Sequence, residues 1–166
     1  MKKLFIVRHA KSSWDFPELS DYDRPLNKRG KRNAPEMGHR LATRNVNPDA
    51  LVTSPAKRAV ATARRIADKI SFPLALIKKE PQLYHGSIND MIEIIKAVKN
   101  DVDILMIFGH NPGLTDLANQ LSGSDIYNIP TCGIVEIDFE ISSWKDLELV
   151  SGKLISFDYP KKIVAA

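Results

Sequence analysis

The chain has 166 residues, of which 43% are hydrophobic and 27% are charged, a balance that is typical of globular proteins and excludes a disordered chain. Cys132 is the only cysteine, which excludes an internal disulfide framework, and no apolar run approaches the roughly 18 residues that a membrane-spanning helix needs. The net charge of +4 is uneven, since residues 1–79 carry 18 Lys and Arg against 7 Asp and Glu, whereas residues 80–166 carry 6 against 13.

These totals predict a cytoplasmic protein without a membrane association. A lone thiol suits a reducing compartment, and the apolar run behind the first lysines stops at Arg8, too early for a signal peptide. The electropositive half fits an anionic ligand, either a phosphate group or a nucleic acid. Its densest run, Lys28, Arg29, Lys31 and Arg32, equally fits a solvated helix face.

The hydrophobic pattern alternates between strands and helices along the chain. In chain order it predicts a strand over 2–8, a polar loop over 12–27, a helix over 28–44, a strand at 51–52, a helix over 59–70, a strand over 74–77, a helix over 88–98, a strand over 104–108, a helix over 114–121, a strand over 134–139, and a closing hairpin of 147–149 and 153–157. This order predicts one α/β domain over residues 1–166, a three-layer α/β/α sandwich whose central sheet is mainly parallel with an antiparallel portion.

Basic and histidine residues follow three of the predicted strands. Arg8 and His9 end the first strand, the stretch 53–58 follows the second, and the stretch 109–113 follows the central one. Ligands of such folds bind beyond the carboxyl ends of the strands, so we expect these groups to gather at one edge of the sheet. Ser54-Pro55 and Asn111-Pro112 each fit a helix N-cap followed by proline, which predicts helix N-termini aimed at the same crevice.

Two arginines, two histidines and helix N-termini form a site suited to phosphate. Guanidinium groups present paired donors that match phosphate oxygens. A histidine nitrogen can attack phosphorus, carry the phosphoryl group and pass it to water. Cations around the transferred group stabilise the charge on its oxygens, which is most of what phosphoryl transfer requires.

Four stretches, FIVRHAKSSW, DRPLNKRG, VTSPAKRAVATA and FGHNPGL, resemble the histidine phosphatase superfamily, and in detail its SixA-like phosphohistidine phosphatase branch. They touch residues 4–14, 23–30, 52–63 and 107–114 in the family's order. The resemblance implies a phosphoglycerate-mutase-like fold and a phosphatase that works through a phosphohistidine intermediate. Ala10 departs from the family, in which most members have glycine, and we expect this methyl group to be tolerated.

The resemblance also implies roles for individual residues. His9 is expected to be the nucleophile that becomes phosphorylated, and Arg8, Arg58 and His110 to complete the phosphate pocket. Arg24, in the Asp-Arg-Pro-Leu stretch, resembles a further arginine contact to the phosphate in the small branch. No cofactor is implied, and the histidines lack metal-ligand spacing, so we predict no metal.

The leaving group decides the substrate. Ester-cleaving members of the superfamily usually supply a Glu or Asp acid after the third strand, where this chain has His85 in Leu83-Tyr84-His85-Gly86. A histidine leaving group needs less help from an acid, so the missing carboxylate favours a phosphoramidate, such as phosphohistidine on a protein. His85 itself is a candidate general acid or an ordinary loop residue. The loop after the nucleophile offers four further carboxylates, Asp15, Glu18, Asp21 and Asp23.

The sequence supports four other functions less well than it supports a phosphohistidine phosphatase. The same chemistry on a small phosphomonoester is the main alternative. A mutase needs a larger lid than this chain has, and a non-catalytic reader of phosphoproteins would not need both histidines. A nucleic-acid-binding module would use the basic half, but that half has almost no aromatic residues for base stacking, so we expect no nucleic-acid partner. The sequence leaves the oligomeric state open and is compatible with a monomer.

Overall fold

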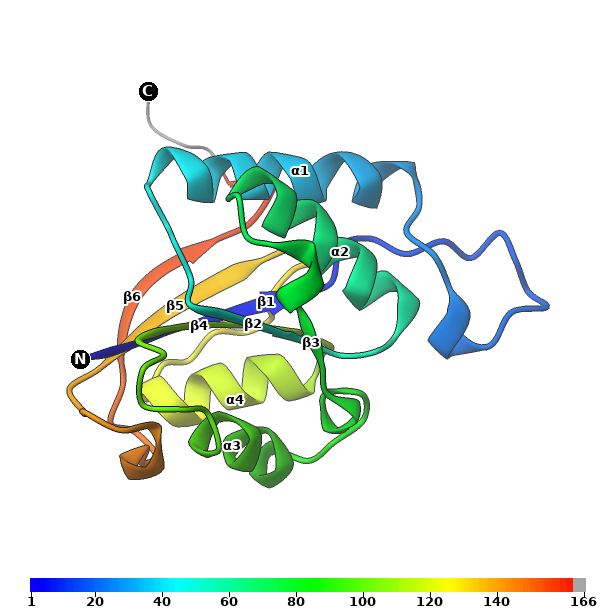
Figure 1. The fold of residues 1–166 in the computed structure, drawn as a ribbon. Helices are drawn as coiled ribbons and strands as arrows, with labels where there is room; N and C mark the ends of the chain where they lie inside the picture. Colours follow the sequence, from blue (N-terminus) through cyan, green and yellow to red (C-terminus); the bar gives the residue numbers. More distant parts are fainter. Residues whose placement is uncertain (163–166) are drawn as a thin grey trace.

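The computed structural model describes residues 1–162 and consists of one six-stranded sheet with two helices on each face (Figure 1). The strands are β1 (Lys2–Arg8), β2 (Ala50–Thr53), β3 (Lys78–Lys79), β4 (Ile104–Gly109), β5 (Ile134–Phe139) and β6 (Lys153–Asp158). The α-helices are α1 (Lys28–Thr43), α2 (Lys57–Lys69), α3 (Ile88–Lys96) and α4 (Gly113–Ser122), and four short 3-10 helices span Asp21–Asp23, Leu74–Leu76, Pro81–Leu83 and Trp144–Asp146. The predicted α/β class is confirmed.

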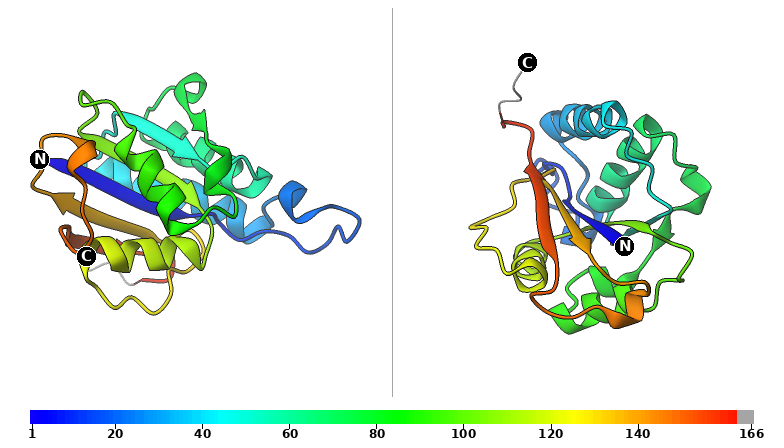
Figure 2. Two further views of the ribbon diagram at one scale, coloured as in Figure 1. Left: turned by 90° about the horizontal axis from the view of Figure 1, so that it is seen from below. Right: turned by 90° about the vertical axis from the view of Figure 1, so that its left-hand side faces the viewer.

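The sheet order is β3-β2-β4-β1-β5-β6. The first four of these strands run parallel, and β5 and β6 are antiparallel additions at one edge. The strands β1 and β4 are therefore central and are paired from Lys3 opposite Ile104 to Arg8 opposite Gly109. Their carboxyl ends lie at the edge of the sheet from which the segment 12–27 projects (Figure 1 and Figure 2).

The core has two halves, because alternate residues of a strand face opposite sides of the sheet. In β1, Leu4 and Ile6 pack under α3 and α4, whereas Phe5 and Val7 pack under α1 and α2. All four side chains are buried. Burial on both faces is what a continuous apolar run in a central parallel strand indicates, and it fixes the end of β1 rigidly.

Two predicted elements are wrong. The run 74–77 is not a strand: Pro73 precedes a 3-10 helix over Leu74–Leu76, and only Lys78–Lys79 pairs with β2. These leucines lie at the sheet edge, where Leu76 is 66% exposed, so burial does not favour an extended conformation there. The predicted closing hairpin also fails, because β6 pairs with β5 and residues 147–149 form no strand. Leu147 instead packs into the core behind the buried Trp144.

Candidate active site

Sheet register places the two predicted catalytic histidines next to each other. Arg8, the last residue of β1, pairs with Gly109, the last residue of β4, and the amide of His9 donates to the carbonyl of Gly109 at 3.1 Å. His9 and His110 follow directly, and their ring centroids lie 5.1 Å apart. Arg58 is the second residue of α2, which follows β2 on the other side of β4. The structure thus brings the residues of all three motifs to one sheet edge.

His9 lies at the floor of this site, where its side chain is held in one tautomer. The residue is 8% exposed, and Nδ1 lies 2.7 Å from the carbonyl oxygen of Ala10. A carbonyl only accepts, so Nδ1 carries the proton and Nε2 keeps its lone pair. Burial lowers the pKa of His9 to about 4, and the charges of Arg58, Arg8 and Arg24 add to this effect against the opposing bond to Ala10. The ring is therefore neutral at physiological pH and keeps a free lone pair on Nε2.

The His110 ring is held through Nε2, whereas the His9 ring is held through Nδ1. Nε2 of His110 lies 2.8 Å from Oγ of Ser54, which accepts the amide proton of Ala56 at 3.2 Å. The Ser54 hydroxyl proton is then free to point at Nε2, an arrangement that leaves the His110 proton on Nδ1. Burial lowers the pKa of His110 to about 3, with further contributions from His9 and Arg58. His110 is thus a neutral ring with Nδ1 available as a donor.

Buried donors without partners gather in this site. Among residues 1–162, the buried side-chain polar atoms that have no hydrogen-bond partner are Nε of Arg8, Nε of Arg58 and Nδ1 of His110. One outer nitrogen of Arg8, Nη1, donates to the carbonyl of Ile129, and both outer nitrogens of Arg58 donate to Asp21. Unpartnered buried donors are costly, so their concentration at one point indicates a site for an acceptor-rich anion.

The two guanidinium groups also repel each other. Burial lowers the pKa of Arg8, and the charge of Arg58 lowers it further. Two cations at close range favour an anion that binds to both, since its charge relieves the repulsion. Phosphate fits because its oxygens accept the paired donors that an arginine edge presents.

Arg24 lies close to the site but is fully engaged by the protein. Its Nε donates to the carbonyl of Ser13 at 3.1 Å, one Nη binds the hydroxyl of Ser12, and the other donates to Oδ1 of Asp21 at 3.1 Å. The exposed ring of Trp14 covers its guanidinium at 3.4 Å. These contacts make Arg24 an organiser of the segment 12–27, and its charge still acts on His9.

Asp21 is one of the four loop carboxylates that the sequence analysis named without choosing among them, and the structure brings it to the site. Its carboxylate accepts from Nη2 of Arg58 at 3.0 Å and from the hydroxyl of Tyr84 at 2.9 Å, in addition to the bond from Arg24. Partial burial raises the pKa of Asp21, but the bonds from Tyr84 and Arg58 and the charge of Arg58 outweigh it and lower the pKa to about 2. The sequence feature that could have pointed to Asp21 is an acidic pair, Asp21 and Asp23, directly before Arg24 in an otherwise basic half of the chain.

His85, the candidate general acid, stands at the exposed side of the site. Its ring contacts that of Tyr84, with centroids 4.0 Å apart, and its backbone has a φ of 63°. It lines a cavity of about 330 Å³ together with His110 and Asn111. The structure therefore brings His85 near the site without a hydrogen bond to His9 or His110.

The predicted helix caps are wrong in detail. The helix α2 begins at Lys57 with Ala56 at its N-cap, and α4 begins at Gly113 with Pro112 at its N-cap. Ser54 closes a tight turn before α2, and its hydroxyl serves His110 instead. Asn111 does bond to the amide of Thr115, but it stands one residue before the cap.

Backbone contacts explain two smaller features of the motifs. Ala10 is buried, does not have a positive φ, and its amide donates to Oγ1 of Thr62 at 2.9 Å, so the methyl group in place of glycine is accommodated. A Cβ at Gly30, in the first turn of α1, would collide with the carbonyl oxygen of Lys11. Glycine is thus required where α1 packs against the strand end that carries His9.

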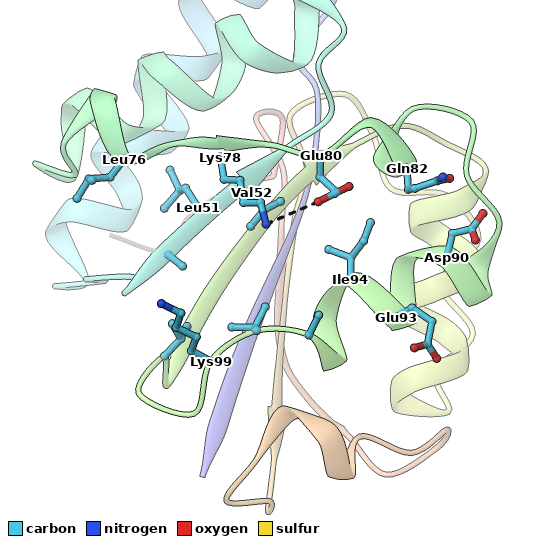
Figure 3. A pocket seen from close by; sticks show the side chains of 14 residues that line it. Leu51, Val52, Leu76, Lys78, Glu80, Gln82, Asp90, Glu93, Ile94 and Lys99 are labelled. Carbon is cyan, nitrogen blue, oxygen red and sulfur yellow. Dashed lines mark ion pairs between the residues drawn. The ribbon is translucent and has the colours of Figure 1, made fainter.

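A separate cavity of about 560 Å³ lies between β2, β3 and α3 (Figure 3), and no histidine lines it. Apolar side chains such as Leu51, Val52 and Ile94 line it, and Lys78 and Glu80 pair at its rim at 3.8 Å. None of the residues predicted for catalysis lines this cavity, so it is not part of the phosphate site.

Three further observations bear on the sequence predictions. In α1, Lys28, Lys31 and Arg32 are exposed, as a solvated helix face requires. Across residues 1–162, no three His, Cys, Asp or Glu side chains converge closely enough to hold a metal ion. Within the same residues, no helix is both long and apolar enough to cross a membrane.

Comparison with known proteins identifies relatives over nearly the whole chain. Residues 4–111 match the sequence model of the Histidine phosphatase superfamily (branch 1). An uncharacterized chloroplastic protein of Arabidopsis thaliana is 30% identical over 159 residues, which cover 91% of this chain and 72% of that protein.

Solved structures share the fold. A structure assigned as the phosphohistidine phosphatase SixA of Agrobacterium tumefaciens superimposes with a TM-score of 0.82 at 25% identity, covering 96% of this chain and 98% of that one. The protein histidine phosphatase SixA in complex with tungstate gives a TM-score of 0.82 at 22% identity, covering 95% and 97%.

Proposed function

Because this chain belongs to the histidine phosphatase superfamily, we propose that it is a phosphatase that hydrolyses phosphohistidine on proteins. Membership of the family supports the phosphatase activity itself. The likeness in fold to the SixA phosphatases, which are described as phosphatases of phosphohistidine or protein histidine, supports phosphohistidine as the substrate class. The residues of this chain supply the rest of the argument.

The observation that carries the proposal is the set of unpartnered buried donors on Arg8, Arg58 and His110, placed around a neutral His9. Phosphoryl oxygens are the acceptors that would satisfy all three donors. With the phosphoryl group so held, Nε2 of His9 attacks phosphorus in line with the bond to the leaving group. The bond from Nδ1 to Ala10 stabilises the phosphorylated, cationic ring.

Water completes the cycle. It attacks the phosphorus of phosphorylated His9, the P–N bond breaks, and the imidazole of His9 regains the electron pair on Nε2. The two protons of the water leave with the inorganic phosphate. The same donors on Arg8, Arg58 and His110 stabilise the charge on the phosphoryl oxygens in both steps. Arg24 contributes its charge and holds the segment 12–27 against the site.

The choice of phosphohistidine follows from the acids that the site lacks. Asp21, the carboxylate that reaches the site, has a pKa of about 2 and carries no proton to donate at neutral pH. An alcohol leaves poorly without such a donor, whereas an imidazole with a proton on its second nitrogen leaves as a neutral ring.

The second candidate is a small phosphomonoester, and one observation favours it. His85 lies beside the cavity that adjoins His110, where an imidazolium would be able to protonate a leaving oxygen. In that case His85→Gln would abolish ester hydrolysis. For phosphohistidine as the substrate, the same variant retains most of its activity.

The environment of the protein belongs to the proposal as well. The single, buried thiol fits a reducing compartment, and we place the protein in the cytoplasm on this ground. Its partner is then a cytoplasmic protein that carries phosphohistidine.

The experiment that tests the function compares two substrates without added metal. We expect a phosphohistidine-bearing protein to be hydrolysed much faster than p-nitrophenyl phosphate. His9→Ala should lower both rates by at least about 1000-fold, since it removes the nucleophile. Preference for the ester by the wild-type enzyme would refute phosphohistidine as the substrate, and full activity of His9→Ala would refute the mechanism.

A further inference from the structure

The Asp21 carboxylate is much more exposed to solvent than the proposed nucleophile, His9. The His9 side chain forms the buried floor, whereas the Asp21 side chain is 46% exposed at the mouth. The contacts of Asp21 with Arg58 and Tyr84 place it over the phosphate-binding arginine and beside the ring that packs on His110. In-line displacement sends the leaving group away from the nucleophile, and therefore toward this mouth.

One acceptor position on this carboxylate remains unused. A carboxylate accepts about four hydrogen bonds. Oδ2 of Asp21 accepts from Arg58 and from Tyr84, and Oδ1 accepts from Arg24. Oδ1 therefore retains capacity for one more donor. The low pKa of Asp21 means that this oxygen belongs to a charged group at every physiological pH.

We propose that Asp21 determines specificity by accepting the N–H of the leaving imidazole, so that the site favours phosphohistidine over phosphate esters. This inference rests on the proposed function and names the group that recognises its leaving ring. Asp21 binds the departing part of the substrate, and Arg8, Arg58 and His110 bind the phosphoryl part.

The chemistry of the step balances without an added acid. The substrate ring carries phosphorus on one nitrogen and a proton on the other, and is therefore cationic. Nε2 of His9 forms the new P–N bond, the old P–N bond breaks, and its electron pair returns to the leaving ring. That ring departs neutral with its proton still on the nitrogen that faces Asp21, while His9 takes over the positive charge.

A fixed carboxylate has opposite effects on the two substrates. It stabilises the protonated, cationic form of the substrate ring, because an opposite charge and a hydrogen bond both favour that form. It disfavours an ester, because an alcohol oxygen that develops negative charge is repelled by Asp21 and finds no proton there. One residue thus lowers the barrier for one leaving group and raises it for the other.

A purely structural role for Asp21 makes a different prediction. If Asp21 served only to orient Arg58 and Arg24, its loss would disturb the phosphoryl-binding half of the site. Phosphohistidine and an ester present the same phosphoryl group, so both substrates would lose activity by the same factor. The ratio of the two kcat/KM values therefore separates the two roles.

The test measures kcat/KM for a phosphohistidine peptide and for p-nitrophenyl phosphate in the wild type, Asp21→Asn and Asp23→Asn. Loss of one charge-assisted hydrogen bond should lower the ratio of phosphohistidine to ester activity by about 10-fold to 100-fold in Asp21→Asn. Asp23, whose carboxylate accepts from Ser20 on the exposed loop, is the matched control and should leave the ratio unchanged. Asp21→Ser replaces Asp21→Asn if the amide variant does not fold.

The pH dependence gives a second readout. Acid protonates the substrate ring from solvent, so the deficit of Asp21→Asn on phosphohistidine should shrink as the pH falls from 8 to 6. An equal loss on both substrates, or a deficit that does not change with pH, overturns the inference and leaves Asp21 as an anchor for Arg58. A wild type that hydrolyses only the ester would instead overturn the proposed function, and this inference with it.

Discussion

The ring centroids of His9 and His110 lie 5.1 Å apart because their strands, β1 and β4, are paired in parallel register up to the last residue. Each ring is held by one nitrogen, His9 through Ala10 and His110 through Ser54. The other nitrogen of each ring is left for the substrate. Since burial keeps both rings neutral, we propose that His9 serves as the nucleophile and His110 as a donor.

Neutrality of the two histidines predicts an unusual titration. The pKa of His9 is lowered to about 4 and that of His110 to about 3, whereas a free histidine titrates near 6.5. We therefore expect both rings to stay unprotonated through pH 5 in the free enzyme. NMR titration of the ring nitrogens, assigned with His9→Gln and His110→Gln, measures this directly. A midpoint near 6.5 for either ring would contradict the predicted burial of the site.

The same shifts predict how stability depends on pH. Both pKa values are lower in the folded protein than in the unfolded chain, so between pH 6.5 and about 3 the unfolded state binds more protons. Stability from this source is complete above pH 6.5 and falls as the pH is lowered through that window. Urea unfolding at pH 7 and pH 4.5 should show a smaller loss in the double variant His9→Gln/His110→Gln than in the wild type.

Substitution of Arg58 by lysine tests whether its guanidinium binds Asp21 and the phosphoryl group at the same time. The outer nitrogens hold Asp21, and Nε is left for the phosphoryl group. A lysine is a point charge and cannot serve both, so Arg58→Lys should lower kcat/KM by about 100-fold and weaken inhibition by inorganic phosphate. The exposed Arg64 of the same helix provides the control, and Arg64→Lys should behave as the wild type.

Cys132 is predicted to be chemically inert although it lies close to His9, the proposed nucleophile. Its amide donates to the carbonyls of Arg8 and His9, but its thiol is buried, and burial raises its pKa to about 12. Iodoacetamide at pH 8 should leave the activity of the native enzyme unchanged. Inactivation that Cys132→Ala prevents would show that the thiol is accessible.

Much of the site was predictable because it depends on strand ends. Apolar runs locate β1 and β4, and a parallel sheet brings their carboxyl ends together whatever the length of chain between them. Arg8, His9 and His110 are then neighbours by register, and Arg58 follows from its place in the first turn of α2. The prediction at 74–77 failed at the sheet edge, where exposure removes the burial that gives a strand its pattern. The prediction at 147–149 failed because Leu147 is buried in the core without pairing in the sheet.

By itself the sequence determined the α/β order, the family and the four residues at the strand ends, since hydrophobic periodicity and short motifs are local properties of the chain. Only the tertiary structure decided what the segment 12–27 does. That segment has no periodicity, so its path depends on contacts with distant elements, above all those of Asp21 with Arg58 and Tyr84. Which of four loop carboxylates reaches the site is fixed by these long-range bonds, and no pattern within the loop records them.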